Sequence, residues 1–502
     1  MRKMIKIIGM CILIFILLIV GLRIKNMLFP PKVDSSELDI DKIFAQQAQS
    51  QEGLHPLENI EQRTIDIKYI SKDNIVDTRQ MRLYIPKDAE QPIPVIYIPH
   101  YEMTEDAVEL RKYLAEGWMV ASPTKFDNKY NGQLTDDDLV FNNAALYTLR
   151  HMEEVDHQRI ALVGGSAGGY TTLMLNALQM GINASIANSP IANVYFNFYQ
   201  YFPEGNQLNN NKMGWVMLKG LFKMITAEIT AKEMLKTMMD LPIPFLGMVS
   251  GMFEPILDNF PDKEDIARWE AFSPVALANH FSSPLVINHV TSDVLVPVDQ
   301  ISRRFTYEEN GSSMPEGFST RLNSSYPGVL GHTLEEELPS DLTRTVHIII
   351  TDPDKDSILP YDSKKPFNLN IYDDGTVESY GSHRATSGTG VTDDIPYLRD
   401  MLSRSLAETE MLLPGKLLLL LDRYQGESIQ LPAHQGIDDT VYGSLVIYQQ
   451  EVVEELNQWA ENHSMNELNH FIQGSITDID DTILKNQYTA TWKEIKEKLS
   501  RM

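Results

Sequence analysis

The chain has 502 residues, 43% of them apolar, and carries a formal net charge of −26. The length predicts two folded parts, and the apolar fraction supports a large core, which excludes an intrinsically disordered chain. The acidic balance excludes a general nucleic-acid binder, which needs a basic surface. Cys11 is the only cysteine, so the folded parts can hold neither a disulfide nor a cysteine metal site, and we expect no metal or cofactor.

Residues 1–30 are predicted to form an N-terminal signal-anchor, a transmembrane segment. Three basic residues precede sixteen uncharged ones, Ile7 to Leu22, and no small-x-small cleavage site follows them. We expect a membrane-anchored protein with its catalytic part outside the cytoplasm, and a cleaved secretory peptide is the alternative. Six of the 43 basic residues and no acidic one lie before residue 33, so the remainder carries about −32 and would be repelled by anionic lipid.

Strands and helices alternate from residue 61 to about 340, after a polar stalk at residues 31–60. The expected strands and helices are residues 65–70, 81–85 and 95–98 (strands), 105–116 (helix), 118–121 (strand), 139–151 (helix) and 160–163 (strand). Elements of these lengths in this order predict an α/β fold, a mostly parallel sheet with helices on both faces.

A strand-to-helix turn around Ser166 is the most informative motif. Gly164-Gly165-Ser166-Ala167-Gly168 follows the apolar run Ile160–Val163 and precedes an expected helix. A serine with glycines two residues away on each side, between a strand and a helix, is typical of a nucleophile elbow, which holds the hydroxyl at the carboxyl edge of a sheet.

Two further loops carry the residues that a nucleophilic serine needs. The strand pattern from Pro284 ends near Asp293, and the stretch Arg321–Thr333 is interpreted as a strand ending in a loop with His332. His332 would take and return the serine proton, and Asp293 would orient the imidazole. Asp299 competes with Asp293 but falls at the expected start of a helix. His289 and His280 are weaker alternatives, because one lies inside a strand and the other precedes it.

The order Ser166, Asp293, His332 is that of the α/β-hydrolase triad, and the chain resembles this family over roughly residues 60–340. The resemblance implies an oxyanion hole built from the backbone N–H of Ala167 and a second donor from the loop Pro99-His100-Tyr101. That loop resembles the Pro-Gly-aromatic turn of cutinase-like esterases, in which the aromatic residue donates its N–H, here Tyr101, although His100 stands in place of glycine. Packing of this loop against a cap is the alternative.

Two segments lie outside the expected hydrolase core. An insertion at about 196–270 holds many methionines and helical spacing, and is predicted to form a helical cap over the site. These methionines contact an apolar acyl or aromatic group or pack the cap's own core, and contact of the cap with a membrane is a third, weaker alternative. Residues 341–502 are predicted to form an additional C-terminal α+β region of unknown role, with strands at 345–350 and 367–371 and an amphipathic helix over Val441–Trp459.

Three functions are compatible with these features. The first is a serine hydrolase that cleaves small-molecule carboxylic esters through an acyl-enzyme. The second is a peptidase of the prolyl oligopeptidase type, whose elbow Gly-x-Ser-x-Gly-Gly-Tyr is similar, although only about sixty residues precede the core here. The third is a non-catalytic binding protein with the same fold, against which the complete triad argues.

Overall fold

The computed structural model describes residues 54–71, 75–105, 107–124, 136–197, 261–262, 264–290, 296–303, 322–339, 345–351, 394–411, 413–426, 439–462 and 464–501. The chain divides into two units, and one of them (1–52, 198–254 and 313–319) lies outside these residues. The predicted anchor, most of the stalk, most of the cap and the strand expected at 367–371 also lie outside them.

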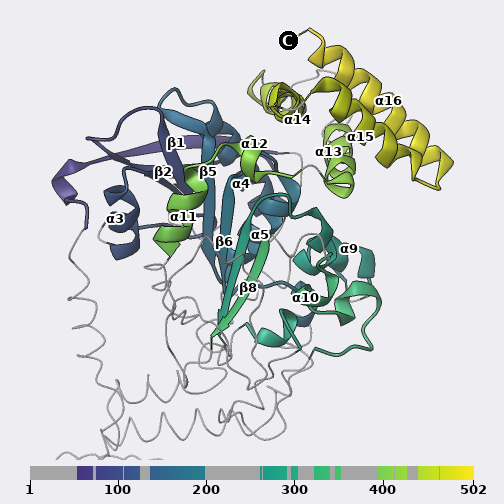
Figure 1. The fold of residues 1–502 in the computed structure, drawn as a ribbon, viewed down its shortest axis with the longest axis horizontal. Helices are drawn as coiled ribbons and strands as arrows, with labels where there is room; N and C mark the ends of the chain where they lie inside the picture. The colour runs from purple at the N-terminus through teal and green to yellow at the C-terminus, as the bar shows by residue number, and fades with distance from the viewer. Residues whose placement is uncertain are drawn as a thin grey trace, which may run out of the picture. The chain divides into compact units, whose positions relative to one another are not determined.

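Eight strands form one sheet in the order β1-β2-β4-β3-β5-β6-β7-β8 (Figure 1). The first two strands, β1 (Ile60–Ile70) and β2 (Val76–Pro86), pair antiparallel, and β2 also pairs antiparallel with β4. All the remaining pairs are parallel. The other strands are β3 (Ile93–Tyr97), β4 (Met119–Pro123), β5 (Val155–Gly165), β6 (Ala184–Asn188), β7 (Leu285–Val290) and β8 (Val346–Thr351). The expected mostly parallel sheet is therefore confirmed.

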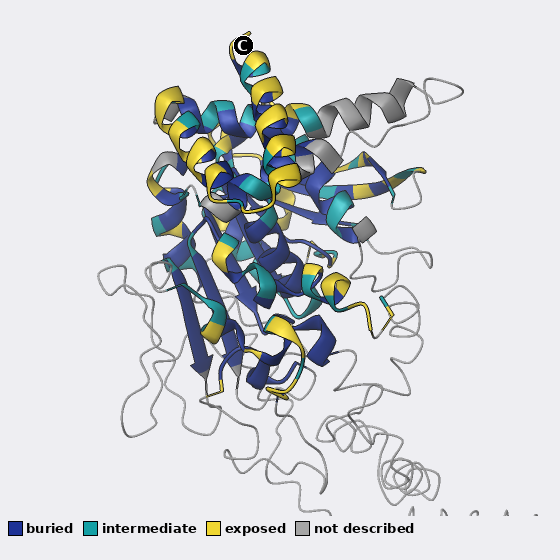
Figure 2. Ribbon diagram, turned by 90° about the vertical axis from the view of Figure 1, so that its right-hand side faces the viewer, coloured by how far each residue is buried: buried dark blue, intermediate teal, exposed yellow. Residues whose placement is uncertain are grey.

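Helices cover both faces of this sheet, so its central strands are buried on both sides and consist of continuous apolar runs. The helices α3 (Val108–Ala115) and α11 (Asp394–Leu402) pack on one face through Leu110, Tyr113 and Leu398. The helices α4 (Asp136–Arg150) and α5 (Ala167–Leu178) contribute Phe141 and Leu175 to the opposite core. Figure 2 shows the central strands almost entirely in the buried colour.

The last strand corrects the predicted organisation. A strand was expected over Arg321–Thr333, but the described residues there form a short 3-10 helix, Gly328–Gly331, and then α10 (Leu334–Glu337). Pro327 has no N–H to donate to a sheet, and Gly328 adopts a φ of 58°. The strand is instead β8, which pairs with β7 from Leu285 to Val290 and lies beyond the predicted boundary at residue 340.

Short helical elements connect these strands to the C-terminal part. They are a 3-10 helix at Leu57–Asn59, α9 (Ile266–Ala271), 3-10 helices at Pro274–His280 and Val298–Gln300, and α12 (Leu406–Thr409). Apart from β8, the regular elements among the described residues of the C-terminal region are helices. The predicted helix over Val441–Trp459 is confirmed as α14 (Asp439–Asn462).

Four C-terminal helices form a core of their own. They are α13 (Pro414–Gly426), α14, α15 (Met465–Thr477) and α16 (Thr482–Leu499), and their shared core includes Leu420, Leu456, Ile472 and Trp492. The outward faces of α15 and α16 are exposed in Figure 2. These amphipathic helices bury one face each against their neighbours.

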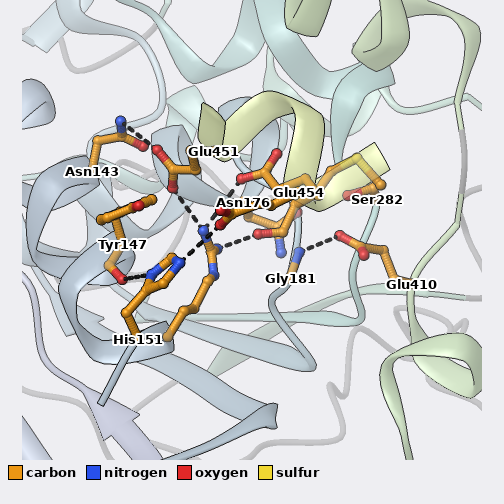
Figure 3. A network of polar contacts seen from close by, with 12 residues as sticks. Asn143, Tyr147, His151, Asn176, Gly181, Ser282, Glu410, Glu451 and Glu454 are labelled. Atoms are coloured by element: carbon orange, nitrogen blue, oxygen red, sulfur yellow. Dashed lines mark hydrogen bonds and ion pairs between the residues drawn. The ribbon is translucent and has the colours of Figure 1, made fainter. Parts of the chain in front are cut away.

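Polar contacts join these helices to the part that contains the sheet (Figure 3). Arg150, at the end of α4, is paired with Glu451 at 2.8 Å and with Glu455 at 3.2 Å, both on α14. The buried ammonium group of Lys416 in α13 donates to the carbonyl of Asn176 in α5 at 2.8 Å. Since buried charges are tolerated when paired, these contacts hold the helices against α4 and α5.

Candidate active site

Ser166 lies in the turn between β5 and α5, as the sequence predicts. Its backbone adopts φ 55° and ψ −117°, a conformation that residues with a side chain rarely take. The N–H of Ser166 donates to the carbonyl of Asn188, at the end of β6, at 2.8 Å. This strained turn, held by the neighbouring strand, presents Ser166 at the carboxyl edge of the parallel strands.

Glycines make the turn possible because nothing larger fits around it. A Cβ on Gly164 would lie 2.2 Å from the carbonyl oxygen of Gly168, and one on Gly168 would lie 2.8 Å from the carbonyl oxygen of Pro99. A Cβ on Gly169 would lie 3.0 Å from Pro190. The motif's spacing therefore follows from the close approach of β5, α5 and the loops on either side.

The amino end of α5 adds an electrostatic contribution. The helix begins at Ala167, directly after the serine, so its first N–H groups have no partner within the helix. Such a helix end carries partial positive charge and favours negative charge nearby. It lies where charge would develop on an oxygen bound beside Ser166.

Tyr101 reaches Ser166 through its side chain and not through its backbone. The predicted donor, its N–H, instead donates to the carbonyl of Pro99 at 3.0 Å and closes a tight turn. Its hydroxyl lies near enough to the side chain of Ser166 and to the N–H of Ala167 that both lower the pKa of the phenol. The predicted N–H is thus engaged with Pro99, and the direction of the Tyr101 side chain depends on tertiary packing.

The environment of the Tyr101 hydroxyl keeps it protonated. Although 40% of the residue's surface is exposed, burial of the hydroxyl raises its pKa above the usual value of 10. The contacts with Ser166 and Ala167 lower the pKa in part, and the charge of Asp138 raises it. The phenol is therefore a hydrogen-bond donor throughout the neutral range. Its ring lies over Gly168, because a Cβ added to this glycine would lie 3.4 Å from Cδ2 of the ring.

His332 lies in the connection between β7 and β8. It directly follows the 3-10 helix Gly328–Gly331, and its side chain is 49% exposed. Its Nδ1 contacts Glu337 of α10, a carboxylate that the sequence analysis did not consider. Within the described part of the chain, the contacts of this imidazole do not include Ser166. The sequence could have suggested this contact, since Glu337 follows His332 by only five residues.

The remaining candidates are divided between described and undescribed residues. Asp293 lies outside the described residues, so the triad acid has no described geometry. Asp299, its competitor, is buried within the 3-10 helix Val298–Gln300. His289 is buried within β7, as expected of an interior histidine, and His280 ends the preceding 3-10 helix.

The position of β8 adds one more histidine to consider. Because β8 runs parallel to β7, β6 and β5, the chain leaves it at the same edge of the sheet as Ser166. The residues that follow, 352–393, include His383 and lie outside the described part. The apolar run at 345–350 was predicted to be a strand, but of a separate C-terminal region.

None of the described helices has the length and the apolar composition that crossing a bilayer requires. Nowhere in the described ranges do three or more His, Cys, Asp or Glu side chains gather closely enough to hold a metal ion.

Comparison with known proteins yields structural neighbours alone. No family model matches the chain, and no curated protein matches its sequence. Solved structures of α/β-hydrolase-fold enzymes are similar to it at low identity. An acylaminoacyl peptidase from Pyrococcus horikoshii is 14% identical with a TM-score of 0.34, and the match covers 62% of this chain and 39% of that one.

Two further neighbours match to a similar extent. A puromycin-hydrolysing peptidase from Mycobacterium tuberculosis is 17% identical, with a TM-score of 0.32 over 50% of this chain and 34% of that one. A 2,6-dihydroxy-pseudo-oxynicotine hydrolase is 12% identical, with a TM-score of 0.36 over 70% of each chain. This chain thus spans about two fifths of the length of the Pyrococcus enzyme. Likeness of this extent carries no argument about the reaction.

Proposed function

We propose that this chain is a serine hydrolase that cleaves carboxylic esters through an acyl-enzyme. The observation that carries the proposal is the arrangement around Ser166: a strained turn, the amino end of a helix, and two hydrogen-bonding groups beside the hydroxyl. These groups are the N–H of Ala167 and the hydroxyl of Tyr101. Two donors beside a serine match what a tetrahedral intermediate of acyl transfer requires.

In this mechanism the Oγ of Ser166 attacks the ester carbonyl carbon while a histidine takes its proton. The carbonyl oxygen becomes an oxyanion, which the Ala167 N–H and the Tyr101 hydroxyl stabilise. The acyl–oxygen bond then breaks, and the alcohol leaves with the proton from the histidine. Water repeats the sequence on the acyl-enzyme and releases the carboxylic acid.

Two histidines can supply the base. His332 follows from the order of the motifs, with Asp293 as the orienting acid. His383 is a candidate because it comes after β8 in the chain, and the carboxyl end of β8 lies at the same edge of the sheet as Ser166. We would measure kcat for His332→Ala and His383→Ala with the same ester. The base should be the residue whose loss lowers kcat by about 10³-fold or more while the other variant retains activity.

The substrate class rests on the predicted cap. Methionine-rich segments adapt to irregular apolar shapes, so we propose an ester with an apolar acyl or aromatic group. A fluorophosphonate probe, which modifies only an activated serine, distinguishes an enzyme from a non-catalytic member of the fold. Comparing short-chain p-nitrophenyl esters with aminoacyl anilides then distinguishes an esterase from a prolyl oligopeptidase-type peptidase. Absence of labelling at Ser166 would end the proposal, and preference for the anilides would replace it with the peptidase.

The N-terminal segment is proposed to attach the enzyme to a membrane with the catalytic part outside the cytoplasm. Deleting residues 1–30 should give a soluble and fully active protein, since the first described strand begins at Ile60. Fractionation of the full and shortened chains tests this, together with protease treatment of intact cells. Release of the full chain into the medium would indicate the cleaved secretory peptide instead.

A further inference from the structure

A buried cluster of three charged or ionisable side chains lies directly behind Tyr101, and the proposed mechanism does not use it. Arg79 comes from β2, His100 from the loop after β3, and Asp138 from α4. Nη1 of Arg79 lies 2.8 Å from Oδ1 of Asp138, and Nδ1 of His100 lies 3.2 Å from Oδ2. The three side chains are only 7%, 2% and 2% exposed. Such a cluster gains little stability over apolar residues of similar volume, which raises the question of what it positions.

The carboxylate of Asp138 accepts from both neighbours. Burial alone would raise its pKa, but the hydrogen bond and charge of His100, together with Arg79, lower it below the usual range. An ionised carboxylate can only accept, so Nδ1 of His100 carries the proton in this contact. The acid thereby sets the tautomer and the direction of the imidazole ring.

The backbone of Asp138 is held as firmly as its side chain. Its carbonyl accepts from the side-chain amide of Asn142 at 2.6 Å. The oxygen of that amide accepts from the hydroxyl of Tyr97, in β3, at 2.7 Å. Arg79 also lies over the ring of Phe141 at 5.0 Å. The cluster is thus tied to β2, β3 and α4 at once.

His100 holds the turn that directs Tyr101. Its φ of 75° is a left-handed conformation that favours glycine, so a histidine at this position is strained unless its side chain is held. The ring of His100 meets the ring of Tyr101 edge to face, with centroids 4.5 Å apart and an interplanar angle of 84°. Because the Tyr101 N–H is bonded to Pro99, the neighbouring ring also constrains where its hydroxyl lies.

We infer that Asp138 and Arg79 act through His100 as positioning residues that hold the Tyr101 hydroxyl at Ser166. This inference rests on the proposed function, in which that hydroxyl stabilises the oxyanion. Such a donor must be held within about 0.5 Å of its productive position to be effective. Because 40% of the surface of Tyr101 is exposed, its buried neighbours are needed to hold its hydroxyl in place.

A double-mutant cycle tests the inference with Asp138→Asn, Tyr101→Phe and the double variant. We expect Asp138→Asn to lower kcat for a short-chain ester by about 10- to 100-fold with little change in KM, since an oxyanion contact strengthens in the transition state. In the Tyr101→Phe background, where the hydroxyl is already absent, the same substitution should change kcat less than about 3-fold. Equal fold-changes in the two backgrounds would overturn the inference.

A matched control separates positioning from general loss of stability. Glu451→Gln also removes a buried carboxylate that is paired with an arginine, Arg150, but it lies on α14. It should lower the thermal midpoint, as Asp138→Asn does, and leave kcat unchanged below that midpoint. A loss of kcat in Glu451→Gln equal to that in Asp138→Asn would show that stability alone explains the effect.

A second variant covers the case in which Asp138→Asn does not fold. His100→Gly suits the positive φ and removes only the ring that contacts Tyr101, so it should fold and show the same dependence on the Tyr101 hydroxyl. Unchanged kcat in His100→Gly would contradict the inference. The wild-type protein tests the proposed function separately. If it is neither labelled by fluorophosphonate nor active on any ester, the proposed function is wrong. If it is active but the effects of the substitutions on kcat are additive, only the positioning role is refuted.

Discussion

Arg150, the last residue of α4, donates to Glu451 of α14 at 2.8 Å, across 301 positions in the chain. The same guanidinium contacts Glu455 and the carbonyl of Met180. The side chains of Arg150, Glu451 and Glu455 are 9%, 2% and 3% exposed. The C-terminal helices therefore pack on the part that holds Ser166, and buried charged residues join the two.

Replacing Arg150 should destabilise the protein strongly. Arg150→Met would leave Glu451 and Glu455 buried without their cation, which costs about 3–5 kcal/mol in comparable buried pairs. Urea unfolding measures the change in the free energy of unfolding. The exposed pair of Arg399 with Glu116 gives the control, since Arg399→Met should change it by less than about 1 kcal/mol. Equal effects would mean that the Arg150 cluster is solvated and not buried.

Glu410 should make the stability depend on pH near neutrality. Burial raises the pKa of this carboxyl to about 7, the charge of Glu455 adds to the rise, and Lys416, Gly181 and Arg150 oppose it. Below about pH 4.5 the carboxyl is protonated in both the folded and the unfolded chain. As the pH rises to about 7 the unfolded chain loses this proton first, so the free energy of unfolding falls. The loss should reach roughly 2 kcal/mol, allowing for the partial exposure of the residue.

The variant Glu410→Gln isolates this contribution, because an amide can still accept from the N–H of Gly181, which bonds the native carboxylate at 3.0 Å. Its free energy of unfolding should exceed that of the wild type at pH 8, and the difference should vanish near pH 4.5. The exposed control Glu58→Gln should follow the wild type. A constant difference between Glu410→Gln and wild type at all pH values would show that the carboxyl does not titrate in this range.

Ser166→Ala should remove catalysis while preserving the fold. The substitution deletes one oxygen at the elbow and leaves the backbone bond to Asn188 in place. We expect kcat for ester hydrolysis to fall by at least about 10³-fold and fluorophosphonate labelling to disappear. Thermal unfolding should show a similar midpoint. Residual activity above a few per cent would show that another nucleophile acts.

Tyr101→Phe should lower kcat and leave KM nearly unchanged. It removes the hydroxyl that lies beside Ser166 and the Ala167 N–H, and loss of one oxyanion donor costs about 10²–10³-fold. Because burial raises the pKa of Tyr101, the wild-type rate should not fall from loss of this proton below pH 10. The control Tyr113→Phe removes a buried hydroxyl on α3 and should keep full activity. Full activity in Tyr101→Phe would show that the second oxyanion donor is a backbone N–H and not this hydroxyl.

Local chemistry was sufficient for the elbow and for most of the sheet. Glycine spacing around Ser166 dictates a tight turn wherever a strand meets a helix, so the motif alone located it. The strand patterns of β1 to β5 and of β7 follow from short apolar or alternating runs, which depend on nearby residues, whereas β6 was not predicted. The strand predicted over Arg321–Thr333 was wrong, because the prediction gave more weight to the apolar content than to the backbone restrictions of Pro327 and Gly328.

Only the tertiary structure shows which strands pair and which side chains lie beside Ser166. The run at 345–350 was recognised as a strand, but only its pairing with β7 shows that it extends the main sheet. Tyr101 was predicted to act through its backbone N–H, whereas the approach of its hydroxyl to Ser166 depends on the left-handed backbone of His100 beside Asp138, 38 residues away. Contacts between residues far apart in the chain arise from packing of whole elements, so the sequence determined the turn and the strands, while packing determined the partners of Ser166.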